Sequence, residues 1–152
     1  MEENNIYYVP TIFSLMGDPD VDSATLPPKS PAALRKLAKY ADQLVESRET
    51  VIKLIMGGKI TVGLGSDIVA GNLNTDSWRE FKAWRDIGIP ALRALVAATS
   101  DNAKIVGRKD TGVIAPGKLA DIAAWSRDLI NDPKALSQCS FVMKEGTVYK
   151  QV

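Results

Sequence analysis

One carboxylate in this sequence stands where enzymes built on parallel sheets place their chemistry. The run 59–67 reads KITVGLGSD: six of its first seven residues are apolar, β-branched or glycine, and it ends in Ser66 and Asp67. A short apolar run bounded by glycines predicts a buried parallel strand. The carboxyl ends of such strands carry catalytic and binding groups. Asp67 is therefore a candidate for acid–base chemistry, with an exposed loop aspartate that caps the next segment as the alternative.

The chain contains no histidine, and this limits the metal sites and the acid–base catalysts that it can form. Imidazole is the commonest metal ligand and the commonest general acid–base group. Cys139 is the one cysteine, so the 152 residues can form neither a Cys/His zinc site nor a histidine-based triad nor an internal disulfide. Any metal bound by this chain alone needs oxygen ligands. The lone cysteine also fits a reducing compartment.

The composition is that of an ordinary soluble domain. The chain has 152 residues, of which 45% are hydrophobic and 24% charged, enough to bury a single core. A net charge of +1 gives no electrostatic reason to expect nucleic acid or an anionic membrane as partner. No run approaches the roughly 18 apolar residues of a membrane helix, and the N-terminus does not read as a signal peptide. We therefore expect a cytoplasmic protein.

The first half of the chain predicts a βαβ unit. Residues 6–13 (IYYVPTIF) are aromatic and β-branched, as in a strand. A long loop over 16–30 follows, which is either a functional loop that sets substrate specificity or an ordinary solvent-exposed loop. Ser30-Pro31 then opens an amphipathic helix that ends at Gly57-Gly58. Since the strand 59–67 comes directly afterwards, it should pair in parallel with residues 6–13 through a right-handed crossover.

Three further helices are predicted after Asp67. The first is capped by Thr75 or Asp76, ends at Gly88 and carries three aromatic residues at core spacing, which favours packing over a ligand box. The second begins at Pro90 with four inward residues, and the third is a short helix capped by Ser100 or Asp101 that ends at Gly107. The aromatic residues are Trp78, Phe81 and Trp84; the inward residues are Leu92, Leu95, Val96 and Thr99.

The C-terminal part predicts a small antiparallel sheet. Residues 119–125 form its first strand, and residues 141–144 and 147–150 flank Glu145-Gly146 as a two-residue hairpin. Asp121 is expected to be a hydrogen-bonding residue of this sheet rather than a ligand. Gly63-Leu64-Gly65 resembles a nucleotide-binding loop only superficially, because position 68 is isoleucine where a dinucleotide fingerprint requires glycine.

Several of these segments together resemble the C-terminal part of metal-dependent amidohydrolases, in particular the imidazolonepropionase- and Xaa-Pro-dipeptidase-like branch. The resemblance begins with a strand ending in GSD at Ser66-Asp67 and continues with IPALRALVAATSDNAKIVG over 89–107. TGVIAPGKLADIAAW over 111–125 and the terminal FVMKEGTVYK complete it. It extends over nearly the whole chain, from about Ile6.

The fold that this resemblance implies is α/β: a (β/α)8 barrel joined to a small β-sandwich. Residues 6–13 and 59–67 would be the seventh and eighth barrel strands. Residues 1–107 would form the last two βα units of the barrel, and residues 108–152 would contribute strands to the sandwich. Two of eight strands leave the barrel incomplete.

The resemblance also implies a site. Asp67 matches the strand-eight aspartate that contacts the catalytic metal, expected to be zinc, and acts as general base on its bound water. Tyr8, Thr11 and Asn72 are the candidates for lining a substrate pocket. The family's other ligands are an HxH pair on the first strand, a lysine or glutamate on the fourth, and histidines on the fifth and sixth; none of these strands is present in this sequence.

Two classes of function follow. The chain is part of a hydrolase that cleaves C–N bonds of small amides or dipeptide-like substrates by metal-activated water. Alternatively, it is an inactive fragment or interaction module whose unpaired strand edges bind an N-terminal partner chain or a second copy of itself. We expect the isolated chain to be inactive, because Asp67 is one ligand where three or four are needed.

Overall fold

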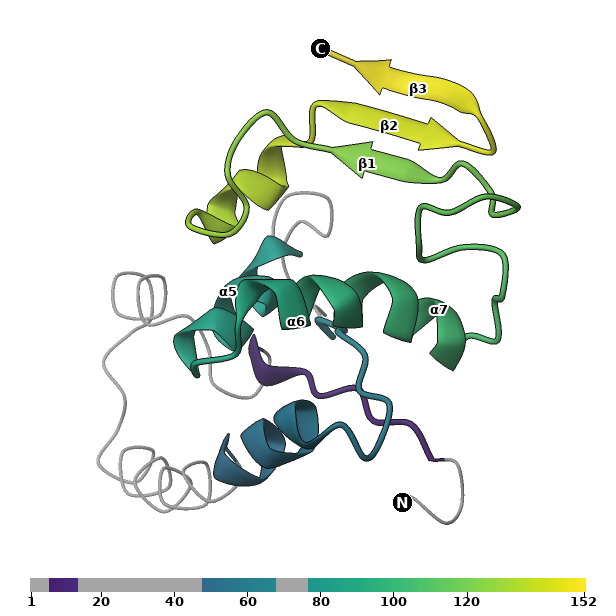
Figure 1. The fold of residues 1–152 in the computed structure, drawn as a ribbon. Coiled ribbons are helices and arrows are strands. Elements are labelled where there is room, and N and C mark those ends of the chain that lie inside the picture. The colour runs from purple at the N-terminus through teal and green to yellow at the C-terminus, as the bar shows by residue number, and fades with distance from the viewer. Residues whose placement is uncertain (1–5, 14–47, 68–76) are drawn as a thin grey trace.

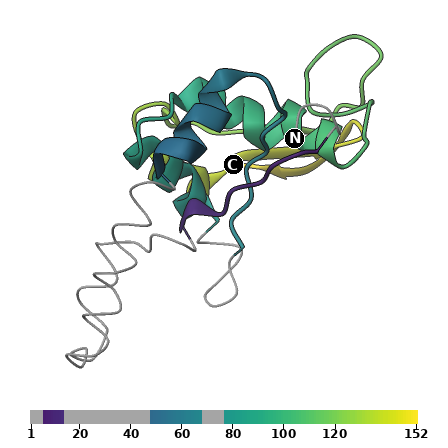
Figure 2. The ribbon, with the colours of Figure 1, turned by 90° about the horizontal axis from the view of Figure 1, so that it is seen from below.

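The computed structural model describes residues 6–13, 48–67 and 77–152. The expected loop over 16–30, the start of the first helix and Asn72 lie outside these ranges. A helical layer crosses the middle of the molecule, with a three-stranded sheet on one side of it (Figure 1). The helix formed by residues 48–57 lies on the opposite side, as Figures 1 and 2 both show.

The first two predicted strands meet in parallel, as the βαβ pattern predicts. Tyr8 and Val62 form a single parallel bridge. The Tyr8 N–H donates to the Thr61 carbonyl at 3.2 Å, and the Gly63 N–H donates to the Tyr8 carbonyl at 2.9 Å. The regular pairing is shorter than the apolar runs indicate, because the chain turns into a helix at Ile12.

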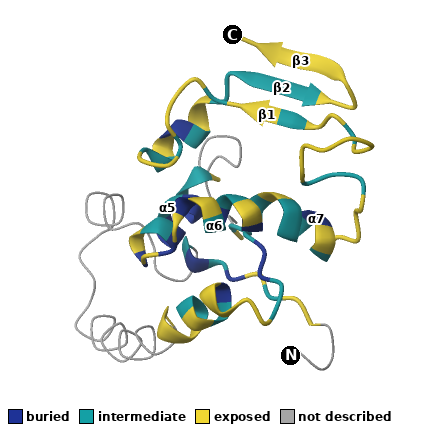
Figure 3. Cartoon of the chain, viewed as in Figure 1, coloured by how far each residue is buried: buried dark blue, intermediate teal, exposed yellow. Residues whose placement is uncertain are grey.

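Helix α5 (Trp78–Asp86) supplies much of the core. Phe81 and Trp84 are buried among Ile12, Ile55 and Val62, which confirms packing as the role of these two side chains. Trp78, the third aromatic residue, is half-buried and lies against Arg79. The helix η3 (Pro133–Gln138), which the sequence did not indicate, packs against α5; its Leu136 contacts the core and its Ala135 is buried. Figure 3 shows the buried residues gathered along α5, α6 and the N-terminal segment.

The next helix is continuous, which corrects the prediction of two separate helices. It comprises α6 (Ala91–Val96), the π-helical segment η2 (Ala97–Asp101) and α7 (Asn102–Ile105). No cap forms at Ser100 or Asp101; the hydroxyls of Thr99 and Ser100 donate to the carbonyls of Leu95 and Val96, four residues earlier in the same helix. These hydroxyls thus hydrogen-bond to carbonyl groups inside the helix instead of capping the N-terminus of a new one.

The inward face of this helix also differs from the prediction. Ala91, Ala94 and Ala97 are buried, whereas Leu92 and Val96 are 65% and 45% exposed and Thr99 is exposed; Leu95 is half-buried. Alanine lets the helix backbone approach the large side chains of α5, so the small residues form the contact and the larger ones face outward. Of the four residues predicted to face inward, Leu95 packs against the core, whereas Leu92, Val96 and Thr99 are exposed.

The C-terminal part forms the predicted antiparallel sheet, but its first strand is shorter than the predicted 119–125. β1 (Ile122–Ala124), β2 (Phe141–Lys144) and β3 (Thr147–Gln151) form an antiparallel sheet in the order β1-β2-β3. Glu145 and Gly146 both have positive φ, 50° and 81°, as a two-residue hairpin turn with the twist of its strands requires. No helix within the described ranges is long and apolar enough to cross a membrane.

Candidate functional site

Asp67 lies where the extended segment after Val62 leaves the parallel bridge. Its side chain is exposed, and its backbone adopts a left-handed conformation with φ of 45°, which aspartate tolerates better than most residues. Within the described residues, no side chain pairs with its carboxylate. The carboxylate is thus accessible to a molecule that approaches this end of the strand.

Tyr8 and Thr11 are both half-buried on the neighbouring segment. Burial raises the pKa of the Tyr8 phenol above its ordinary value of 10.0. Because Tyr8 lies level with Val62, Asp67 is five residues farther along, roughly 16 Å in an extended chain. Thr11 advances three residues in the same direction, so it lies nearer than Tyr8 to the level of Asp67. Both remain predictions as pocket residues.

A buried carboxylate that the sequence reading missed holds the end of the first segment. Glu80 of α5 is fully buried. Its Oε1 accepts from the Ile12 N–H at 2.9 Å and from Trp84 Nε1 at 2.8 Å, and its Oε2 accepts from the Phe13 N–H at 2.7 Å. Burial raises the pKa of Glu80 above its ordinary value of 4.5, against the opposing effect of these three donors.

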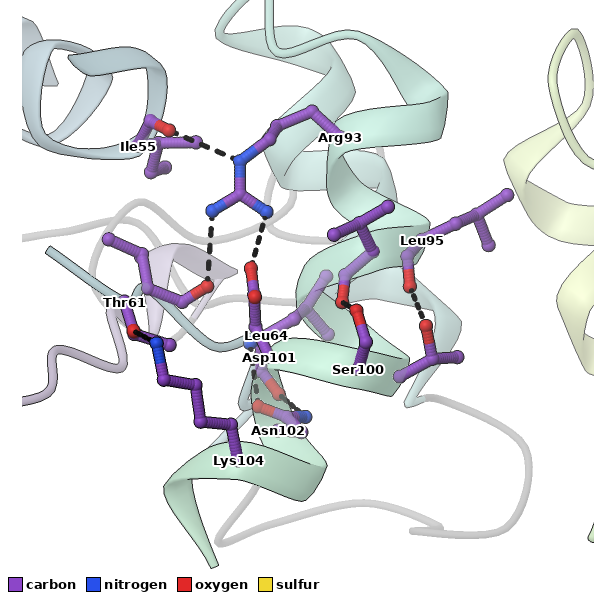
Figure 4. Close-up of polar contacts among 12 residues, drawn as sticks. Ile55, Thr61, Leu64, Arg93, Leu95, Ser100, Asp101, Asn102 and Lys104 are labelled. Atoms are coloured by element: carbon purple, nitrogen blue, oxygen red, sulfur yellow. Dashed lines mark hydrogen bonds and ion pairs between the residues drawn. The ribbon is translucent and has the colours of Figure 1, made fainter. Parts of the chain in front are cut away.

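The last helix holds the second segment in a comparable way. Asn102 Oδ1 accepts from the Leu64 N–H at 3.1 Å, and Asn102 Nδ2 donates to the Leu64 carbonyl at 2.8 Å. Arg93 donates to the Val62 carbonyl at 3.3 Å and to the Ile55 carbonyl at 3.2 Å, and pairs with Asp101 at 2.8 Å. Figure 4 shows Arg93 and Asn102 directed at this segment from one helix, with the Asp101 carboxylate on the Arg93 guanidinium.

Sequence patterns gave no sign of these holding residues. Glu80 and Asn102 occupy ordinary polar positions of predicted helices, and only the tertiary packing brings them to backbone groups 38 to 68 residues away. Asp121 behaves as expected: its Oδ1 accepts from the Glu145 N–H at 2.8 Å, so it holds the hairpin turn.

The described residues do not by themselves fit a catalytic metal. They contain no group of three or more histidine, cysteine, aspartate or glutamate side chains arranged to hold an ion. Asp67 supplies one carboxylate, and the whole chain has no histidine. A divalent metal held by three or four ligands therefore needs donors from outside this part of the chain.

Comparison with known protein families gives a match over the full length. The family model described as "Amidohydrolase family" matches residues 1–152. Among curated proteins, a 5-methylthioadenosine/S-adenosylhomocysteine deaminase from Dictyoglomus thermophilum is 35% identical over 80 residues, which cover 47% of this chain and 19% of that protein. A 5'-deoxyadenosine deaminase from Methanothermobacter thermautotrophicus is 35% identical over 89 residues, 53% of this chain and 20% of that protein.

Solved structures match a larger share of the chain. A Xaa-Pro dipeptidase with methionine bound in its active site superposes with a TM-score of 0.72 and 30% identity, over 99% of this chain and 36% of that protein. Ochratoxinase from A. niger superposes with a TM-score of 0.75 at 23% identity, over all of this chain and 34% of that protein, and shows likeness of fold alone. The chain thus spans about a fifth of the curated relatives and about a third of these structures.

Proposed function

The chain belongs to the amidohydrolase family, and we propose that it supplies part of a hydrolase that breaks C–N bonds in small amides or dipeptide-like molecules. The observation that carries the proposal is Asp67 at the exposed end of a segment bridged in parallel to residues 6–13, within a family match over 1–152. The names of the matched proteins, deaminase and dipeptidase, support the bond type.

In this proposal residues 1–107 form the last two βα units of a (β/α)8 barrel, and residues 108–152 form strands of a small β-sandwich. The parallel bridge between Tyr8 and Val62 supports the barrel part, because adjacent barrel strands run in parallel. The separate antiparallel sheet β1-β2-β3 supports the sandwich part. The remaining strands of both would come from outside these residues.

Asp67 is proposed as the general base. Its exposed carboxylate takes a proton from the attacking water as the C–O bond forms, and it returns that proton to the nitrogen as the C–N bond breaks. The carboxylate is regenerated, so the step balances with water as the only co-reactant. Tyr8, Thr11 and Asn72 are proposed to line the pocket that orients the substrate. A divalent metal, expected to be zinc, could bind at this site only if residues outside the described part of the chain supplied its other ligands.

A second candidate function is that of a docking module without activity of its own, and exposed apolar surface favours it. Leu92, Val106 and Ile114 are 65%, 70% and 84% exposed. A cleft of about 880 Å³ opens between α6–α7 and the sheet, lined by apolar residues such as Leu95, Ile122 and Trp125. Its proposed occupant is the remainder of the amidohydrolase fold, in the same or another polypeptide, because the chain spans 36% of the matched dipeptidase.

The purified 152-residue chain is expected to be inactive alone under both proposals, so amide hydrolysis is measured for the chain alone and for the chain mixed with the remaining part of an amidohydrolase. Hydrolysis restored in the mixture and abolished by Asp67→Asn would support the hydrolase part, whereas association without restored hydrolysis would favour the docking module. Stoichiometric metal with turnover by the chain alone that Asp67→Asn abolishes would show that the chain is an enzyme by itself. Asp86→Asn is the matched control, because Asp86 is an exposed carboxylate of α5 that pairs with Lys82.

A further inference from the structure

The segment that leads to Asp67 has two edges, and its backbone groups alternate between them. Thr61 and Gly63 direct their backbone groups toward Tyr8 and supply the two hydrogen bonds of the Tyr8–Val62 bridge. Val62 and Leu64 therefore direct theirs to the opposite edge. In the described part of the chain no strand pairs with this second edge.

Side chains of one helix bind the backbone on this second edge. The Asn102 carboxamide both accepts from the N–H and donates to the carbonyl of Leu64, at 3.1 and 2.8 Å. A carboxamide carries the same donor and acceptor as a peptide group, so Asn102 offers Leu64 what a paired residue would. Arg93 donates to the Val62 carbonyl one step earlier on the same edge.

Gly63, between Val62 and Leu64, has no side chain that would collide with Asn102. A Cβ atom added to Gly63 would lie 2.2 Å from Asn102 Oδ1 and 2.6 Å from Ile105 Cδ1, closer than real side chains approach. Glycine at position 63 thus leaves room for the Asn102 carboxamide.

The π-helical segment explains how Arg93 and Asn102 reach the same edge. Nine residues of regular α-helix turn by about 900°, which would place these two positions on opposite sides. The segment η2 between them accommodates one extra residue, so the rotation is about 800° and the positions lie about 80° apart. The Arg93–Asp101 ion pair, eight residues apart at 2.8 Å, fits the same rotation.

We propose that Asn102, with Arg93, is a positioning residue that holds the backbone of Leu64 and Val62 and thereby fixes the direction in which Asp67 leaves the segment. Leu64 lies three residues before Asp67, whose own carboxylate has no partner among the described residues. We call the two hydrogen bonds between Asn102 and Leu64 the clamp. Among the described residues, it is the side-chain contact nearest in sequence before Asp67. The role assigned to the clamp rests on the proposed function of Asp67.

Amide hydrogen exchange of the full 152-residue chain, read by NMR, tests the clamp without any need for activity. In Asn102→Ala the Leu64 amide should exchange at least tenfold faster, while the Gly63 amide, held by Tyr8, keeps its protection. The Asp67 N–H order parameter should fall in the same variant. Ser100→Ala is the control, because the Ser100 hydroxyl donates only within its own helix.

Equal protection of Leu64 in Asn102→Ala and wild type would overturn the proposal, as would loss of protection at Leu64 and Gly63 together. If Asn102→Ala does not fold, Asn102→Leu provides the test, since it has a similar volume and removes the oxygen that accepts from the Leu64 N–H. In the wild type, a nuclear Overhauser contact between the Asn102 side-chain amide and the Leu64 N–H is expected, and its absence would also overturn the clamp. If Asp67→Asn leaves activity intact in a working enzyme, the proposed function fails while these exchange results still stand.

Discussion

At the scale of single residues, the two carboxylates that matter most have opposite environments. Asp67 is exposed and accessible, whereas Glu80 is fully buried and accepts three hydrogen bonds from Ile12, Phe13 and Trp84. Both act near the ends of the two bridged segments. We infer that the exposed carboxylate serves chemistry and the buried one serves the backbone that positions it.

Replacement of Glu80 by glutamine should lower the free energy of unfolding by about 1–3 kcal/mol, because an amide NH₂ would face the Phe13 N–H where Oε2 now accepts. Urea denaturation measures the loss. Asp86→Asn, an exposed change of the same chemistry, should have little effect. Equal stability of Glu80→Gln and wild type would show that these contacts contribute nothing net.

The same pair of proteins tests the titration of Glu80. Since burial raises its folded-state pKa above 4.5, the native state binds a proton that the unfolded state has released. The unfolding free energy of the wild type, relative to Glu80→Gln, should therefore be highest below pH 4.5 and decrease as the pH rises through the folded-state pKa. A relative stability that increases over this range would indicate a lowered pKa.

Gly63 offers a double-mutant test of how closely Asn102 approaches. Gly63→Ala should destabilise the wild type, because the new Cβ meets Asn102 Oδ1 at 2.2 Å. The cost should be smaller in an Asn102→Ala background, with a coupling within the roughly 0.5–3 kcal/mol of residues in contact. Gly57→Ala is the control, since a Cβ there meets nothing within 4 Å. Additive costs at 63 and 102 would contradict the contact.

At the scale of elements, the sequence predicted those turns and helix ends that depend on the residue at one position. The Glu145-Gly146 hairpin and the helix ends at Gly58, Gly88 and Gly107 were readable because left-handed conformations favour glycine. The π-helical segment and the buried alanine face of α6 were not, since they depend on which surface the helix meets. Asp67 was found as the end of an apolar run, but Glu80 and Asn102 act across tertiary contacts that no spacing reveals.

Deletion of Thr99 tests the role of the π-helical segment. Without the extra residue the helix should become regular, and the eight remaining steps from Arg93 to Asn102 turn by the same rotation of about 800°. We therefore expect circular dichroism to show retained helix and the Leu64 amide to keep its protection. Thr99→Ala, which keeps the residue count and loses only a hydroxyl bonded to Leu95, is the control. Loss of Leu64 protection in the deletion variant but not in the control would contradict this explanation.

At the scale of the whole molecule, Asp67 is the one carboxylate that the described residues place at the proposed site, and apolar residues on α6 and beyond are exposed. Leu92, Val106 and Ile114 face outward, and the cleft beside the sheet is lined by apolar side chains. The chain covers 36% of the matched dipeptidase. We infer that the site becomes complete only when the rest of the amidohydrolase fold is present.

A chimera tests this account most directly: the chain replaces the matched part of the Xaa-Pro dipeptidase, and kcat for dipeptide hydrolysis is measured. The account predicts an active chimera in which Asp67→Asn lowers kcat by about 10²- to 10⁴-fold, the range for loss of a general base. Asp86→Asn in the same chimera should leave kcat unchanged. An Asp67→Asn chimera as active as its parent would contradict the assignment of Asp67 as the base.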